Sequence, residues 1–404
     1  MTLTHPGDRS AADGLEFFVG GADVSPLPLP PFDPRACAFL SDVSARLRAD
    51  PAAQGFPDLQ TFAFWCRSAN LQGLSTKHGD GRSRLGLGLL YHITPANVPV
   101  NFAYSFAFGL LAGNANIVRA PSRDIPQIDL FARVVAEVLG SHPTIKGMTA
   151  FVRHPHDDKI TGLLSARCNG RIVWGGDATV RAIRAIPRPE RSIEIAFPDR
   201  YSFCIIDADA VVALAPEALA RLADGFYNDT YLMDQDACSS PHLVIWLGSA
   251  ASKQAGKEKF WQAVRERVAA RYRLEEEPAV EKYTRLLLAA ADGNALTYVR
   301  QMGNEVYTVG LARMPDSIDI LRGRYGLFYE YDTEDRTALA VPITAKFQTL
   351  TYFGVDPLGL RDLVIGQRAV GIDRIVPVGQ ALDIGLVWDG LDIISTLSRI
   401  IDVR

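Results

Sequence analysis

Apolar runs of strand length alternate with amphipathic stretches of helical length from about residue 85 onward. The strand-like runs are 85–93, 114–120, 149–154, 171–176, 193–197 and 201–207. The helical stretches begin near Val100 and surround IDLFARVVAEVLG, DKITGLLSARC and ATVRAIRAI. This alternation is typical of β-α-β units. It therefore predicts an α/β fold with a Rossmann-type, doubly wound parallel sheet.

A second α/β unit is predicted to begin near Ala208. Its first helix is PEALARLADGFYND, its first strand is HLVIWLG, and a long charged helix follows from about Lys253 to Tyr272. The remaining strand candidates are TYVR, EVYTVG, LFYEY and KFQTLTYFG. We therefore expect a dinucleotide-binding domain with its N-terminal segment in 1–206 and a catalytic domain in 207–375. We expect residues 376–404 to serve oligomerisation or to return to the first domain.

Residues 85–118 contain no Asp, Glu, Lys or Arg, which on charge alone could mimic a membrane span. Pro95 and Pro99 interrupt the run, however, and its longest apolar piece, FAYSFAFGLLAG, has only about 12 residues. We expect this piece to be a buried core helix, with the lining of an apolar tunnel as an alternative, and no membrane span.

Composition narrows the class of partner. The chain has 404 residues, a net charge of −4 and a pI near 6.0, so nucleic acid is not an expected partner. The five cysteines are an odd number without a CxxC pair, which supports neither a disulfide framework nor a metal site. Because no secretory signal is visible either, we expect a cytoplasmic protein.

Cys238 stands in the polar run DQDACSSP, which is typical of a turn before a strand. A thiol in such a loop is a candidate nucleophile, whereas Cys204 within YSFCIID is typical of a buried residue. The alternative for Cys238 is a loop cysteine without chemistry. His242 could lower the pKa of Cys238, but a packing role is favoured because this histidine opens a strand.

The glycine pattern expected of a dinucleotide site, GxGxxG, is missing. Gly86 and Gly88 fall inside a strand pattern and indicate close backbone packing. Gly175 and Gly176 lie between a strand and a helix start, where backbone N–H groups could meet a pyrophosphate. Asn97, between two prolines at a strand end, could donate to an oxyanion or form an Asx turn.

The run ITPANVPVNFAYSFAFGLLAGNANIVRAPSRD resembles the aldehyde dehydrogenase superfamily, and more narrowly the LuxC-type acyl-CoA reductases. The same resemblance includes WGGD, FPDRYSFC, DQDACSSP, DRIVPVGQALD and WDG, in this order. It covers about residues 85 to 400 and implies an aldehyde-dehydrogenase-like fold with a cofactor domain and a catalytic domain.

The resemblance implies roles for individual residues. Cys238 matches the catalytic cysteine, and Asn97 matches the asparagine that forms the oxyanion hole with the Cys238 backbone N–H. Glu194 matches the general base of hydrolytic members, although Ala196 and Phe197 replace the glycines that usually follow. Glu330 resembles the glutamate that holds the nicotinamide ribose.

Around the cofactor, Ala120 stands where the superfamily usually has lysine. Arg119 and Arg123, beside Ser122, could instead bind a ribose phosphate, which favours NADPH over NADH. Val180 stands where the superfamily has the last glycine of the helix-opening motif.

The implied activity is NADPH-dependent reduction of an acyl thioester, carried by CoA or by a carrier protein, to an aldehyde. Fatty acyl groups, a homo-oligomer and an acyl-activating partner protein are implied as well. The alternatives are a hydrolytic aldehyde dehydrogenase that produces an acid, or a noncatalytic acyl-binding assembly partner.

Overall fold

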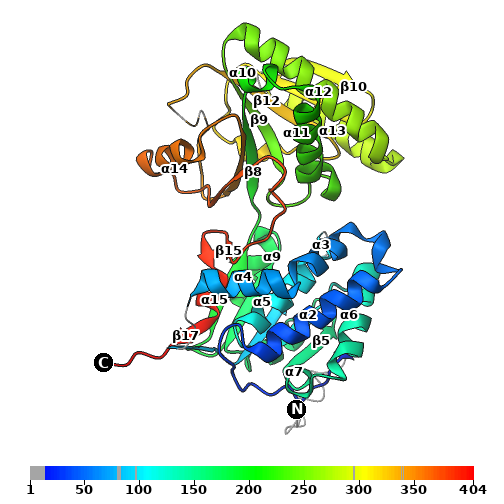
Figure 1. Ribbon diagram of the computed structural model, residues 1–404, viewed down its shortest axis with the longest axis vertical. Coiled ribbons are helices and arrows are strands. Elements are labelled where there is room, and N and C mark those ends of the chain that lie inside the picture. The colour runs from blue at the N-terminus through cyan, green and yellow to red at the C-terminus, as the bar shows by residue number, and fades with distance from the viewer. Residues whose placement is uncertain (1–13, 80–82, 96–97, 294–295, 338, 340) are drawn as a thin grey trace. The chain divides into compact units, whose positions relative to one another are not determined.

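The computed structural model describes residues 14–404 except 80–82, 96–97, 294–295, 338 and 340. The chain divides into two compact units (Figure 1). Unit 1 comprises residues 1–198 and 386–404, and unit 2 comprises residues 199–385. Each unit is built on its own sheet.

The sheet of unit 1 has the order β1-β5-β4-β3-β6-β7. Its strands are β1 (Glu16–Val19), β3 (Leu89–Ile93), β4 (Ala115–Arg119), β5 (Thr149–Arg153), β6 (Gly170–Trp174) and β7 (Ile193–Phe197). All neighbours pair in parallel except β1, which is antiparallel to β5. The five parallel strands therefore have the doubly wound order, in which successive strands are added on one side of β3 up to β5 and then on its other side from β6 onward.

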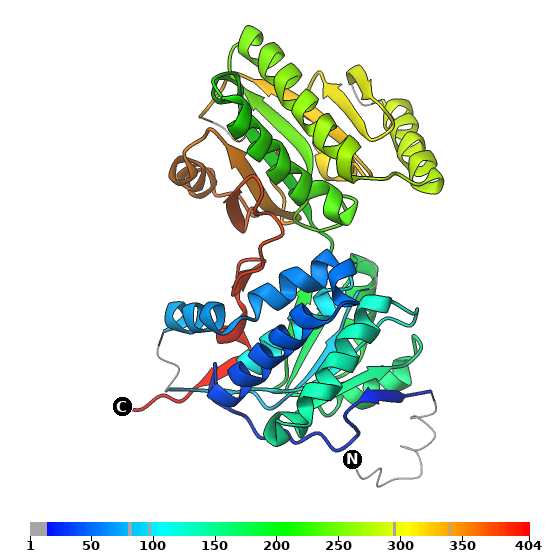
Figure 2. The same ribbon diagram turned by 45° about the vertical axis from the view of Figure 1, so that its right-hand side comes forward.

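The helices of unit 1 are α2 (Pro34–Ala49), α3 (Pro57–Trp65), α4 (Ser68–His78), α5 (Asn101–Leu111), α6 (Pro126–Leu139), α7 (Pro143–Lys146), α8 (Asp158–Ser165), α9 (Asp177–Ala185) and α15 (Ile393–Thr396), with a 3-10 turn at Ala53–Gly55. Figure 2 shows α2, in blue, and α6, in blue-green, side by side over the sheet. The uncharged segment that could mimic a membrane span contributes α5, in which every residue after Asn101 is buried.

Aromatic contacts explain the burial of α5. Phe102 and Phe106 meet Phe131 of α6 and Phe151 of β5 mostly edge to face. The helix is therefore a core element, as predicted, and its side chains are occupied by packing, which does not favour the alternative of a tunnel lining. Among the described residues, no helix is long and apolar enough to cross a membrane.

The sheet of unit 2 has the order β10-β11-β12-β9-β8-β13-β14. Its strands are β8 (Tyr201–Asp207), β9 (Pro241–Leu247), β10 (Leu296–Met302), β11 (Val306–Leu311), β12 (Leu327–Thr333), β13 (Phe347–Phe353) and β14 (Arg374–Pro377). All pairs are parallel except β10 with β11. The predicted strands of this unit are therefore present.

Helices cover both faces of this sheet. They are α10 (Ala208–Val212), α11 (Pro216–Thr230), α12 (Ala250–Arg271), α13 (Glu276–Ala291) and α14 (Pro357–Gly366), with 3-10 turns at Tyr231–Met233 and Ile318–Ile320. On one face of the sheet, strand residues pack against α11 and α12 in one core cluster. On the other face, the alternate strand residues pack against α13 and α14 in a second cluster. Since both faces are buried, the strands are continuous apolar runs.

The boundaries of the units differ from the predicted ones. The first lies after Pro198, before the predicted residue 206, because β8 pairs with β9 and β13 and so belongs to the second sheet. The last lies after Gly385, beyond the predicted residue 375, because β14 still pairs with β13.

The C-terminal segment lies in unit 1. It forms a small hairpin of β15 (Val387–Trp388) and β16 (Leu391–Asp392), and then β17 (Ser398–Ile400), which pairs with β2 (Arg84–Gly86). The pairing of β17 with β2 joins this segment to unit 1, as one of its two predicted roles requires.

Gly86 and Gly88 serve close packing, as predicted, although Gly88 lies in the bend between β2 and β3 and not inside a strand. A Cβ at Gly86 would overlap the carbonyl oxygen of Gly113. Gly88 has a φ of +132° and lies against the side chain of Asn169, while its N–H donates to Oδ1 of Asn114 at 3.0 Å. The two glycines therefore let the backbone approach its neighbours, and neither lies at a strand-to-helix turn.

Gly86→Ala is expected to destabilise unit 1 by about 1–3 kcal/mol, because the added methyl group overlaps backbone atoms that cannot move away easily. The measurement is the free energy of unfolding in urea, followed by circular dichroism. Gly73→Ala in α4 is the control, because a Cβ there meets nothing within 4 Å. This exposed helical glycine should gain about 0.5–1 kcal/mol on substitution. Equal effects of the two changes would contradict the packing role of Gly86.

Candidate active site

The loop that carries Cys238 connects α11 to β9 in unit 2. Asp234 and Gln235 have φ values of 52° and 60°, so two consecutive residues other than glycine adopt the left-handed conformation. The buried side chain of Gln235 compensates this strain. It accepts from the N–H of Gly326 at 2.7 Å and donates to the carbonyls of Leu327 at 3.1 Å and Pro241 at 3.3 Å. The loop is therefore tied to the starts of β9 and β12.

Cys238 is partly exposed at the end of this loop. Its carbonyl oxygen accepts from Oγ of Ser202 at 2.7 Å, and its sulfur accepts from Nε2 of Gln348 at 3.3 Å. The backbone and the side chain of the cysteine are thus both held by residues of the neighbouring strands β8 and β13.

The other cysteines are poor candidates for a nucleophile. Cys66, Cys168 and Cys204 are buried, and burial raises the pKa of each thiol, to about 12 for Cys204. Burial also raises the pKa of Cys37 to about 11. Because the thiolate is the reactive form, these raised pKa values disfavour the other four cysteines as nucleophiles.

His242 is a packing residue. It is buried against the ring of Tyr201, and its Nδ1 lies 2.9 Å from the carbonyl oxygen of Gly323. Burial, assisted by the charge of Arg322, lowers the pKa of His242 to about 3. A neutral imidazole provides no positive charge for a thiolate, so the packing interpretation agrees with the geometry.

Glu330 lies inside the core of unit 2, with 2 % of its surface exposed. Its Oε1 accepts from the indole N–H groups of Trp246 at 2.6 Å and Trp261 at 2.9 Å, and its Oε2 accepts from the hydroxyl of Tyr298 at 2.7 Å. A carboxylate with these buried partners is not accessible to a ribose. The arrangement favours a structural role for Glu330 over the predicted ribose contact.

The candidate cofactor residues of unit 1 follow the carboxyl ends of β4 and β6. Gly176 is the N-cap of α9, with no side chain to cap the helix, and a Cβ at this position would meet nothing within 4 Å. The space before the first turn of α9 is therefore open to a ligand. Gly175 precedes it, and a Cβ at Gly175 would lie 3.1 Å from Cγ2 of Thr179, while Val180 is buried. Backbone N–H groups at a helix start and the helix dipole suit a phosphate group.

Arg119 ends β4 and is only 5 % exposed. Its Nη2 donates to the carbonyl of His154 at 3.1 Å and to Oγ of Ser122 at 3.3 Å, whereas its Nε is buried without a hydrogen-bond partner among the described residues. Burial lowers the pKa of Arg119. No ion pair of the described part of the chain includes this arginine, so an anion would supply the missing partner.

Glu194 on β7 is held by two arginines. Oε2 accepts from Nε and Nη2 of Arg171 on β6 at 2.8 and 2.5 Å, and Oε1 accepts from Nε of Arg184 on α9 at 2.9 Å. Arg171 and Glu194 face each other in the β6–β7 register and are 1 % and 5 % exposed. Burial alone would raise the pKa of Glu194, but the hydrogen bonds from Arg184 and Arg171 hold it below its usual value.

This geometry favours a restrained carboxylate over the general base that the family resemblance implies for Glu194. A general base must accept a proton from water, but both oxygens of Glu194 already accept from guanidinium groups. Asn97, the predicted oxyanion donor, lies outside the described residues.

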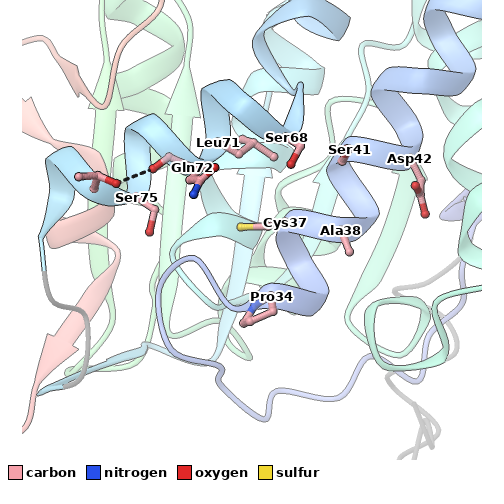
Figure 3. Close-up of a pocket in the computed structure, with 10 residues that line it drawn as sticks. Pro34, Cys37, Ala38, Ser41, Asp42, Ser68, Leu71, Gln72 and Ser75 are labelled. Carbon is pink, nitrogen blue, oxygen red and sulfur yellow. Dashed lines mark hydrogen bonds between the residues drawn. The ribbon is translucent and has the colours of Figure 1, made fainter.

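A groove of about 550 Å³ lies between α2 and α4 in unit 1 (Figure 3). It is lined by Pro34, Cys37, Ala38, Ser41, Asp42, Ser68, Leu71, Gln72, Ser75 and Thr76. None of the predicted site residues lines it, and the raised pKa of Cys37 argues against a reactive thiol there. No metal-binding group of acidic, histidine or cysteine side chains occurs in the described ranges.

Sequence reasoning missed Gln348, Ser202, Arg171 and Arg184. For Gln348, Ser202 and Arg171 the available signal was polarity within apolar strands, as in KFQTLTYFG for Gln348 and in GRIVW for Arg171, whereas Arg184 lies on the helix α9 and gave no such signal. Such residues require buried partners, but their sequence positions do not reveal which ones.

The fold is that of the aldehyde dehydrogenases. An NAD-dependent benzaldehyde dehydrogenase from Corynebacterium glutamicum matches with a TM-score of 0.60 and 14% identity, covering 91% of this chain and 84% of that one. An NAD-dependent aldehyde dehydrogenase from Sinorhizobium meliloti gives 0.60 and 15% identity, over 85% and 74% of the two chains. The D779W mutant of proline utilization A from Bradyrhizobium japonicum gives 0.61 and 17%, over 85% and 38%. Sequence identities this low support a shared fold and nothing further.

More narrowly, residues 73–273 match the family described as acyl-CoA reductase (LuxC). The chain is also similar to long-chain acyl-protein thioester reductases of Aliivibrio fischeri, at 29% identity over 166 residues, and of Photorhabdus luminescens, at 26% over 164. Each alignment covers 40% of this chain and 32% of the relative, so the chain spans about a third of the length of these relatives. The predicted resemblance to LuxC-type reductases is confirmed.

Glu194→Gln is expected to reduce the free energy of unfolding by about 3 kcal/mol at pH 7, because it leaves the buried Arg171 without a counter-charge. The measurement is urea unfolding at several pH values. The pKa of Glu194 is lower in the folded chain than its ordinary value near 4.3, so its ion pairs stabilise above that pH and are lost as the pH falls through the folded value. The difference in the free energy of unfolding between wild type and Glu194→Gln should therefore become smaller below about pH 4.

Arg184→Ala is the control for this substitution. Its side chain is 63% exposed, so its loss should cost less than about 1 kcal/mol. A pH-independent difference between wild type and Glu194→Gln would contradict the ionised pair.

Proposed function

We propose that this chain reduces an acyl thioester to an aldehyde through an acyl-enzyme intermediate on Cys238. The observation that carries the proposal is the anchored, partly exposed thiol, whose sulfur accepts a hydrogen bond from Gln348, within the segment that matches the LuxC family. The names of the relatives, long-chain acyl-protein thioester reductases, support a thioester as substrate.

In the first half-reaction, the Cys238 thiolate attacks the carbonyl carbon of the thioester. The bond from that carbon to the carrier sulfur breaks, and the carrier leaves as a thiolate that takes a proton from solvent. The oxyanion between these events requires N–H donors. The amide of Asn97 and the backbone N–H of Cys238 are the donors that the family resemblance implies.

A nicotinamide cofactor, when bound, supplies a hydride to the acyl carbon in the second half-reaction. The bond from this carbon to the Cys238 sulfur then breaks, and its electron pair returns to the sulfur, so that aldehyde and thiolate are released. The open first turn of α9 after Gly176 and the buried guanidinium of Arg119 fit the phosphates of such a cofactor.

Reduction requires that water does not cleave the acyl-enzyme first. The two arginines that engage both oxygens of Glu194 disfavour its use as a base for water, which supports reduction over the hydrolytic alternative. The noncatalytic alternative leaves the anchored thiol without a purpose.

Several finer features belong to the same proposal. The substrate is a fatty acyl group on CoA or on a carrier protein, NADPH is the preferred cofactor with NADH as the alternative, and an acyl-activating protein supplies the acyl group. We further propose a cytoplasmic homo-oligomer.

Cys238→Ala is expected to abolish the acyl adduct. Wild type and variant are incubated with a medium-chain or long-chain acyl-CoA and weighed by intact-protein mass spectrometry, after which NADPH is added and aldehyde is detected. We expect an adduct only with Cys238 present, and its discharge as aldehyde at a rate at least about 100-fold above the variant's, because loss of a covalent nucleophile typically costs orders of magnitude.

Two outcomes would contradict this proposal. If the adduct is released as acid irrespective of NADPH, and if Glu194→Gln suppresses this release of acid, the hydrolytic alternative is established. Failure to form an adduct with either a CoA or a carrier-protein thioester would favour the noncatalytic one.

Arg119→Gln is expected to weaken NADPH binding about tenfold and NADH binding much less, because only NADPH carries a 2′-phosphate for the guanidinium. The measurement is a titration of cofactor fluorescence with both nucleotides. Arg188→Gln, an exposed arginine after α9, is the control. Equal weakening of both cofactors would assign Arg119 to the pyrophosphate instead.

A further inference from the structure

The pairing of β8 is irregular on both sides at the level of Cys238. Toward β13 the register shifts between Phe347 and Leu350, and toward β9 it shifts between Ser202 and Phe203. Such bulges redirect side chains, and they frequently lie next to active sites. Because β8 has two such irregularities at the level of Cys238, this part of the sheet is a candidate for a functional role.

The hydroxyl of Ser202 occupies the gap that the bulges leave. It accepts from the backbone N–H of Thr349 at 3.1 Å and donates to the carbonyl oxygen of Cys238 at 2.7 Å. A single side chain thus links β8, β13 and the loop of the candidate nucleophile.

Gln348 lies within the bulge of β13 and is fully buried. Its side-chain oxygen accepts from Oγ1 of Thr349 at 3.2 Å, and its backbone oxygen accepts from the N–H of Asp373 at 2.8 Å. Because the oxygen of the amide is engaged in this way, its N–H group is directed at the Cys238 sulfur, 3.3 Å away.

We propose that Gln348 is a catalytic residue whose amide N–H stabilises negative charge on the sulfur of Cys238. This inference deepens the proposed function and rests on it for its place in the reaction. The donor acts twice: it favours the thiolate before attack, when the thiol proton has passed to solvent, and it stabilises the sulfur again when the carbon–sulfur bond breaks.

The physical basis is the strength of a hydrogen bond to an ion. A buried N–H group that is already oriented pays no reorganisation cost when the sulfur becomes charged. Histidine commonly performs this task in cysteine enzymes, but His242 is neutral and bonded to the carbonyl of Gly323. In the described part of unit 2, the hydrogen bond from Gln348 supplies such a donor without a formal charge.

The test measures alkylation of Cys238 by iodoacetamide from pH 5 to 10, without cofactor or thioester. Modification at Cys238 is located by peptide mass spectrometry. Gln348→Ala removes the donor, and Gln348→Glu retains the shape of the side chain but replaces the donor with an acid. The matched control is Gln262→Ala, an exposed glutamine on α12 whose amide bonds to Glu266.

Alkylation at pH 7 is expected to fall about tenfold in Gln348→Ala and further in Gln348→Glu, since a hydrogen bond to an ion is worth at least this factor. The rates of the variants should approach the wild-type rate at pH 10, where the thiol is ionised without help. The control should follow wild type. Circular dichroism identifies a variant that fails to fold. If one of the two Gln348 variants does not fold, the alkylation rate of the other variant tests the inference.

Unchanged alkylation at pH 7 in a folded Gln348 variant would overturn the inference and leave Gln348 with a structural role. An equal fall at every pH would overturn it as well, because it would indicate altered access to the thiol. The outcome is separable from that of the proposed function: a wild type that forms no acyl adduct refutes the reductase proposal, whereas the pH profile of alkylation still reports on Gln348.

Discussion

The hydrogen bond from Ser202 to the carbonyl of Cys238 is the interaction on which the candidate site of unit 2 depends. It closes the gap between two bulged strands and the loop, and it places the sulfur against the amide of Gln348. The left-handed backbone at Asp234 and Gln235 would be costly in a free loop. Tertiary hydrogen bonds therefore determine this conformation, and the local sequence alone does not.

The two glutamates assigned roles by family resemblance illustrate a common constraint. Glu330 and Glu194 are both buried, and a buried carboxylate must be compensated by donors or cations. Glu330 obtains two indoles and a phenol, and Glu194 obtains two arginines. The oxygens of both carboxylates are engaged by these partners, which disfavours Glu330 for ribose binding and Glu194 as a general base. A residue can therefore occupy the position of a catalytic residue of the family and still be unavailable for that role, because the partners that compensate its burial engage its oxygens.

Most of the fold could be predicted because its strands and helices have distinct hydrophobic periods. The apolar runs of both sheets and the core helix α5 follow from local pattern, as does the packing role of Gly86 and Gly88. The error at β8 has a physical cause. A strand buried on both faces is equally apolar in either sheet, so its pattern contains no information about which neighbours it pairs with.

The sequence by itself determined the α/β class, the order of elements and the unusual polar context of Cys238, because propensity and periodicity are properties of neighbouring residues. Only the tertiary structure decided that Gln348 points at the sulfur, that Arg171 faces Glu194 across two strands, and that the C-terminal segment returns to unit 1. These contacts join residues far apart in the chain. Their selection depends on strand register and burial, which are established only when the sheets form.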